Sequence, residues 1–189
     1  MKNTWSAYLE ESHQNMIKEI NTRDLGKIRS DPTEYLVRDW INENTSLRVI
    51  RRNDLHLHPD FPFQPEDPNE SGYDLLSSTG LKIQAKYRQG DLHLETTRRN
   101  SKKNKNDSSS TGHVAYSANE FDVLVIVQPS KEVSDDCTKV EYLAIPTSAL
   151  KRENSDFLVT RVDAKTRKKY KGKAKTVLEN LGNSIDGDE

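Results

Sequence analysis

Apolar side chains recur along this chain at two spacings, and the spacing predicts most of its elements. Apolar residues at helical intervals predict amphipathic helices over residues 4–21 and 32–43. The boundaries of the second helix are also marked, because Asp31 is placed to cap it, Pro32 suits its first position and Glu34 would complete a capping box. The first part of the chain is therefore expected to be helical.

Strand patterns dominate the rest of the chain. The continuous apolar run FDVLVIV (121–127) predicts a central strand buried on both faces. Shorter patterns predict strands at LRVIRR, LHLETT, EYLAIP and DFLVTRV, and AKTVLENLG predicts a last helix with Gly182 as its C-cap. Residues 98–112 hold almost no apolar side chain and predict a mobile loop. We therefore expect an α/β fold, a mixed sheet of about four to six strands flanked by helices.

Length and composition indicate one soluble domain. The chain has 189 residues, of which 32% are hydrophobic, so we expect a single domain over residues 1–189. Its core would span about 31–162, followed by a basic segment and helix at 163–182. No apolar run approaches the roughly 18 to 20 residues that span a bilayer, which predicts a cytoplasmic protein without membrane contact. A lone cysteine, Cys137 in the polar stretch SDDCTK, excludes an internal disulfide and a cysteine-based zinc site.

The formal net charge of −1 hides a strong segregation of charge along the chain. Residues 82–105 carry eight Lys or Arg against two acids, and residues 161–175 carry eight against one. Residues 54–74 carry six acids and neither Lys nor Arg. An acidic stretch beside basic ones is typical of a metal site within a phosphate-binding surface. Charge runs of this kind also occur in solvated loops, and both interpretations stay open.

The stretch YDLLSSTGLKIQAK predicts a hairpin with a defined register. Glycine at the end of a loop over residues 78–80 suits the left-handed position of a three-residue turn. Counting outward from that loop pairs Asp74 with Gln84 and Gly72 with Lys86. Directly opposed residues of an antiparallel pair point to the same face, so Asp74, Gln84 and Lys86 should converge.

Converging groups of these types can support phosphodiester hydrolysis assisted by a metal ion. Mg²⁺ prefers oxygen ligands, which the Asp74 carboxylate, the weaker Gln84 side-chain carbonyl and the Ala85 backbone carbonyl would supply. Lys86 could hold the attacking water and counter the charge on the phosphate. The expected cofactor is therefore Mg²⁺, with Mn²⁺ able to substitute.

These residues carry a resemblance to a known family. Gly72-Tyr73-Asp74-Leu75, a turn and Ile83-Gln84-Ala85-Lys86-Tyr87 resemble the active-site hairpin of the PD-(D/E)xK nuclease superfamily, in the QxK form of Mrr-like restriction nucleases. The usual pattern has Glu or Asp where this chain has Gln84. Tyr116, Phe121-Asp122 and the stretch 142–146 are similar to the C-terminal half of small restriction and homing endonucleases, so the resemblance covers about residues 31–150.

The resemblance implies a restriction-endonuclease-like fold and a type II restriction endonuclease or its cleavage subunit. Such an enzyme cuts double-stranded DNA to leave 5′-phosphates, and cutting both strands needs a homodimer or a second nuclease subunit. An acidic residue on the helix before the first strand often lies near the metal in this superfamily, and Glu34 occupies that place. A capping box explains Glu34 equally well.

The basic segments would then contact DNA. Arg98 and Arg99, at the end of a predicted strand, are the candidates for base contacts. Contacts to phosphates would position the duplex without reading its sequence, and they are assigned to Arg88, Lys102, Lys103, Lys105, Arg167, Lys168 and Lys169.

Other functional interpretations have weaker support. His56 and His58 alternate like metal ligands but lack a third ligand at fitting spacing, and Asp122 suits a hydrogen bond better than catalysis. A non-catalytic nucleic-acid-binding or assembly subunit with a decayed nuclease fold remains an alternative, as does a repair or recombination nuclease that recognises DNA structure.

Overall fold

The structure, a computed structural model, describes residues 27–64, 72–88, 92–99, 111–134 and 137–186. The helix expected at residues 4–21 lies outside these ranges, as do Lys102, Lys103 and Lys105.

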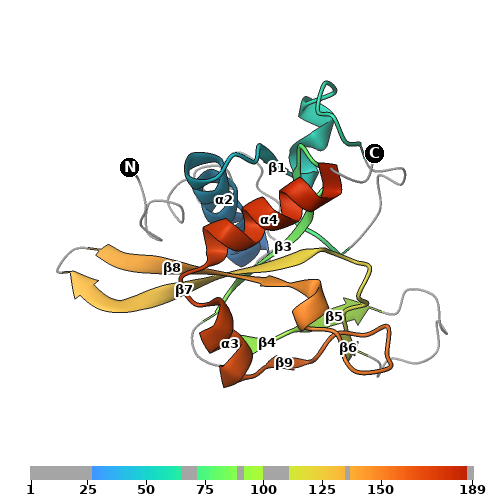
Figure 1. The fold of residues 1–189 in the computed structure, drawn as a ribbon, viewed down its shortest axis with the longest axis vertical. Helices are drawn as coiled ribbons and strands as arrows, with labels where there is room; N and C mark the ends of the chain where they lie inside the picture. The colour runs from blue at the N-terminus through green and yellow to red at the C-terminus, as the bar shows by residue number, and fades with distance from the viewer. Residues whose placement is uncertain (1–26, 65–71, 89–91, 100–110, 135–136, 187–189) are drawn as a thin grey trace.

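A five-stranded mixed sheet forms the centre of the fold (Figure 1), which confirms the expected α/β class at this level. Its order is β1-β2-β3-β7-β8, and β3 pairs in parallel with β7 while the other neighbours are antiparallel. The strands are β1 (Val49–Arg51), β2 (Leu75–Ser77), β3 (Lys82–Tyr87), β7 (Val123–Ser134) and β8 (Cys137–Pro146).

Helices and two small sheets surround this sheet. The helices are α2 (Lys27–Asn44), α3 (Ala164–Tyr170) and α4 (Ala174–Asp186), with 3-10 turns η1 (Arg52–Leu57) and η2 (Thr147–Ala149). One small sheet pairs β4 (Leu92–His93) with β9 (Arg161–Val162), and the other pairs β5 (Glu95–Arg99) with β6 (Thr111–Ala115).

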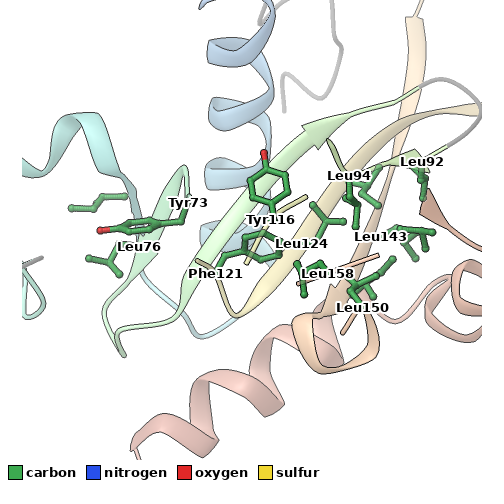
Figure 2. Packing of buried hydrophobic residues seen from close by; sticks show 14 of the residues in the cluster. Tyr73, Leu76, Leu92, Leu94, Tyr116, Phe121, Leu124, Leu143, Leu150 and Leu158 are labelled. Carbon is green, nitrogen blue, oxygen red and sulfur yellow. The ribbon is translucent and has the colours of Figure 1, made fainter. Parts of the chain in front are cut away.

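Each face of the central sheet has its own hydrophobic core. On one face, α2 and α4 pack Leu36, Ile41 and Leu178 against alternate strand residues such as Ile83 and Val125. The opposite face holds the cluster in Figure 2, to which β4, β9 and the segments beside η2 contribute. Figure 1 shows the same division, with α2 and α4 on one side of the sheet and α3, β4 and β9 on the other.

Strand β7 is an interior strand buried on both faces, as the apolar run predicted, although β3 holds the middle position of the sheet. Its residues 123–127 are completely buried, because β3 and β8 flank it and a core covers each face. Hydrogen-bonded pairing with β8 then continues to Ser134 and Cys137, beyond the apolar run. The expectation that Cys137 lies in a loop was therefore wrong, because this residue begins β8.

The first described helix starts earlier than the capping signals predicted. Helix α2 begins at Lys27, so Asp31 does not cap it, and Pro32 lies within the helix rather than at its first position. Glu34 accordingly lies beyond the first turn and has no capping-box role. It contributes to a buried ion pair instead, with its carboxylate 3.9 Å from the guanidinium of Arg51 on β1.

The segments around the small sheets also differ from expectation. LHLETT is divided between β4 and β5, which pair with different partners. Residues 98–99 and 111–112, expected in a loop, extend the β5–β6 pair, while 100–110 lie outside the described residues. DFLVTRV forms a regular strand only at its last two residues, in β9.

Gly182 does not end the last helix, which continues to Asp186. A Cβ atom at this position would lie 2.5 Å from Cδ2 of Leu47, so the glycine allows α4 to approach the segment before β1. The residue was correctly placed near the end of a helix, but a tertiary contact accounts for it rather than a cap.

Candidate active site

The β2–β3 turn has the conformation predicted from its glycine. Gly80 has a φ of +84°, in the left-handed region, and its amide donates to the carbonyl of Ser77. The Ser77 hydroxyl oxygen accepts the amides of Thr79 and Leu81, at 3.2 and 2.9 Å. These bonds fix the loop and therefore the register, in which Leu75 faces Ile83.

This register brings Asp74 and Gln84 together, as predicted. Asp74 immediately precedes β2, where its amide donates to the Ile83 carbonyl and its carbonyl accepts the amide of Arg52, each at 2.9 Å. Its carboxylate oxygen Oδ2 accepts the amide of Ala85 at 2.9 Å and a hydrogen bond from the side-chain amide of Gln84. The carboxylate is thus held between the backbone and a side chain of β3.

Burial dominates the electrostatics of Asp74. Loss of solvent raises the pKa of its carboxyl above the ordinary value, although the Ala85 amide, the charges of Lys86 and Arg52 and the Gln84 side chain each act to lower it. A buried carboxyl with a raised pKa and two cations in electrostatic range is a common feature of functional sites.

Asp74, Gln84 and Ala85 carry oxygen atoms of the types that a hard divalent cation binds, although Gln84 turns its Nε2 and not its Oε1 toward Asp74 and Ala85. Within the described part of the chain, Oδ1 of Asp74 and Oε1 of Gln84 accept no hydrogen bond. The carbonyl of Ala85 faces the same amide group, with Nε2 of Gln84 at 3.3 Å from its oxygen. A carboxylate, an amide oxygen and a backbone carbonyl are ligands that Mg²⁺ accepts, so the donor set suits the metal implied by the resemblance.

Lys86 lies on the same face of β3 as Gln84. Ile83 and Ala85 belong to the core beneath α2 and α4, so the alternating Gln84 and Lys86 point to the opposite face. The ammonium nitrogen of Lys86 lies 5.2 Å from the ring centroid of Tyr116. Tyr116, which follows β6, is therefore a neighbour of the candidate site that the hairpin pattern did not reveal.

Two more cations near the hairpin were missed by the sequence analysis, namely Arg52, in electrostatic range of Asp74, and Lys82, over the ring of Tyr73. The guanidinium carbon of Arg52 lies 5.6 Å, and the ammonium of Lys82 5.5 Å, from the ring centroid of Tyr73. Tyr73 adjoins Asp74 in sequence and is almost fully buried, at 3% exposure. The alternation of β3 could have indicated Lys82, whereas Arg52 reaches the site through the pairing of β1 with β2.

Glu34 is placed differently from the hairpin residues. Its partner Arg51 also makes a bidentate pair with Asp54, at 2.9 and 3.0 Å, and lies over the ring of Tyr35. Arg51 alternates with Ile50 and so shares the α2 side of the sheet, whereas Asp74 faces the other side. Nothing within the described residues joins Glu34 to the hydrogen bonds of Asp74, and its metal role stays a prediction.

The predicted DNA-contacting residues are only partly described. Arg88 donates to the backbone carbonyls of Tyr87 and His93, at 2.9 and 3.3 Å, which ties the end of β3 to β4. Arg98 and Arg99 are the last residues of β5, and the structure does not describe their side chains.

Helix α3 carries the other predicted DNA-contacting residues that the structure describes, Arg167, Lys168 and Lys169. Arg167 donates to the side-chain oxygen of Gln128 at 3.3 Å, while Lys168 and Lys169 are exposed. Asp163 caps this helix, and the hydrogen bond from the Thr166 amide lowers the pKa of its carboxyl.

The competing candidates make no hydrogen bond to Asp74 within the described residues. His56 belongs to η1 and His58 follows it, both exposed, and no group of three or more His, Cys, Asp or Glu suited to a metal occurs in the described ranges. Asp122 accepts the amide of Lys82 at 2.8 Å, which confirms a hydrogen-bonding role at the start of β7.

Comparisons with protein-family models, curated proteins and solved structures find no match to this chain. None of the helices in the described ranges is long and apolar enough to cross a membrane.

Proposed function

We propose that this protein is a Mg²⁺-dependent DNA endonuclease with a restriction-endonuclease-like fold, acting as a type II enzyme or as the cleavage subunit of an assembly. One observation carries the proposal. The Asp74 carboxylate lies against Gln84 and Ala85 of β3 and in electrostatic range of Lys86, so the groups that the proposed chemistry would use are next to one another.

The chemistry divides among these residues by their donor and acceptor groups. A bound Mg²⁺ would supply charge neutralisation at the phosphate and an acidified water. Asp74, Gln84 and the Ala85 carbonyl would hold it. Lys86 would hold the attacking water and counter the charge that develops on the phosphate.

The surroundings of the site favour a polyanionic substrate. Arg52 and Lys86 place two cationic side chains in electrostatic range of the Asp74 carboxylate, and Lys82 adds a third cation over the ring of the adjoining Tyr73. Further along the same sheet face, Arg167 contacts Gln128 of β7, and exposed lysines of α3 follow. Positive charge that extends from the site to α3 supports contact with a duplex through its phosphates.

A plasmid assay tests the proposal. The wild-type protein with Mg²⁺ or Mn²⁺ should nick or linearise supercoiled DNA, and sequencing should find 5′-phosphate ends. Lys86→Ala should lower the rate by about a hundredfold or more, as expected for loss of a group that assists proton transfer. Lys151→Ala, a change at an exposed lysine after η2, is the matched control and should cut normally. Plasmid left intact by the wild type would refute the function.

A second function, a nucleic-acid-binding subunit without catalysis, is favoured by one contact. The Gln84 amide group donates to Asp74, so protein groups alone satisfy that carboxylate oxygen. Titration with Mg²⁺ and Mn²⁺, followed by the backbone NMR resonances of residues 74 and 85, separates the two functions. Resonances that do not respond, together with intact plasmid and retained DNA binding, would establish the binding subunit.

A further inference from the structure

We propose that Tyr116 is a positioning residue for Lys86, with its ring holding the lysine ammonium beside Asp74. This inference rests on the proposed nuclease function and extends the site to a residue outside the β2–β3 hairpin. Tyr116 would act through Lys86 and not on the substrate.

The contact is the defining restraint on an otherwise adaptable side chain. The Lys86 ammonium makes no hydrogen bond or ion pair within the described part of the chain, and it lies 5.2 Å from the Tyr116 ring centroid. A lysine side chain has several rotatable bonds and loses considerable entropy when it is fixed. Attraction between a cation and an aromatic face opposes that loss and selects conformers in which the ammonium lies over the ring.

The ring itself is firmly held. Tyr116 is 5% exposed and meets Phe121 edge to face, with centroids 5.4 Å apart and ring planes at 78°. Its backbone carbonyl accepts the amide of Leu158 at 2.8 Å. In Figure 2 the ring lies beside Phe121, and its hydroxyl points away from the leucines of the cluster. Because the ring is fixed and the lysine is flexible, the ring sets the place of the ammonium.

A purely structural role of Tyr116 would depend on the same packing, so the experiment must separate that role from positioning of Lys86. Tyr116→Phe keeps the aromatic face, whereas Tyr116→Leu keeps an apolar side chain and removes the ring. Leu150→Ala is the matched control, because Leu150 belongs to the same cluster but takes no part in the ring contacts of Tyr116 with Lys86 and Phe121. Plasmid nicking by each variant is measured at several DNA concentrations, which separates kcat from KM, and thermal unfolding is recorded for all.

The positioning role predicts that Tyr116→Leu lowers kcat about tenfold with KM unchanged, the effect of losing a partly desolvated cation–π contact. Tyr116→Phe should keep the wild-type kcat, and Leu150→Ala should lose stability but keep kcat. Equal kcat for Tyr116→Leu and wild type would overturn the inference. A raised KM with unchanged kcat would also overturn it and would indicate a DNA contact instead.

A readout without catalysis distinguishes failure of this inference from failure of the nuclease function. The ε-methylene protons of Lys86 should show an upfield ring-current shift in the wild type and in Tyr116→Phe, and a normal shift in Tyr116→Leu. Unshifted protons in the wild type would refute the contact whatever the activity. If the protons are shifted but the wild type cuts no DNA, the nuclease function fails and the catalytic meaning of the contact fails with it.

Discussion

At the residue scale, Asp74 combines a cost in stability with the central place in the candidate site. Because burial raises the pKa of its carboxyl, the folded state binds a proton more tightly than the unfolded chain. The contribution of this carboxyl to the free energy of unfolding is therefore largest below its pKa in the unfolded chain, near the ordinary value of 3.8. That contribution is lost as the pH rises through the pKa of the folded state.

Asp74→Asn removes this penalty. The variant should unfold at a higher temperature than the wild type near neutral pH, with the difference vanishing below about pH 4 as the wild-type carboxyl becomes protonated. The same change should abolish metal-dependent cutting. Thermal unfolding across pH, measured beside plasmid nicking, checks both effects.

Asp122→Asn provides the control, since burial also raises the pKa of Asp122 and its side chain also accepts a backbone amide. It should leave cutting unchanged. A neutral-pH stability of Asp74→Asn below that of the wild type would show that the hydrogen bonds of the carboxylate outweigh its burial.

The residues that could be predicted from sequence are those whose placement depends on local rules. Asp74, Gln84 and Lys86 followed from one glycine and the two-residue period of a strand. Arg52 and Tyr116 could not be found that way. One reaches the site through the β1–β2 pairing and the other through the segment between β6 and β7, and both depend on contacts distant in sequence.

At the scale of elements, the same distinction separates correct from incorrect predictions. The buried run of β7 and the β2–β3 hairpin each carry their own signal, a continuous apolar stretch and a turn. The pattern of LHLETT predicts one strand, but the segment forms two, because β4 pairs with the distant β9 and β5 pairs with β6. Local propensity cannot anticipate a division that tertiary partners impose.

Gly182 provides a test of such a tertiary constraint. Gly182→Ala would gain about 1 kcal/mol from helix propensity in α4, but its Cβ would overlap Cδ2 of buried Leu47. Overpacking of a core typically costs about 1–3 kcal/mol, so we expect net destabilisation of about 1 kcal/mol. Chemical denaturation of the variant measures it.

The cause is isolated by repeating the substitution in a Leu47→Ala background. There the overlap is absent, and Gly182→Ala should stabilise the protein through helix propensity alone. A destabilising effect in both backgrounds would mean that the contact with Leu47 does not explain the glycine.

At the scale of the whole molecule, the central sheet separates two kinds of surface. The α2 and α4 face carries the buried Glu34–Arg51 pair, and the opposite face carries Asp74, Gln84, Lys86 and the contact between α3 and β7. The hairpin residues of the proposed site and the basic residues of α3 thus share one side of the sheet, whereas Glu34 lies on the other. That arrangement allows a single duplex to reach both the hairpin and α3 without passing around the molecule.

Binding to this face should depend on local charge and not on the net charge of −1. DNA affinity should fall steeply between about 50 and 200 mM salt because phosphate contacts release counterions. Lys168→Gln and Lys169→Gln in α3 should each reduce the slope of log affinity against log salt by about 0.9. Arg38→Gln removes one positive charge from α2 on the other face, where Arg38 pairs with Asp39, and should leave the slope unchanged. Fluorescence anisotropy with a labelled duplex measures these slopes. An equal decrease for all three variants would assign binding to overall charge and remove α3 from the interface.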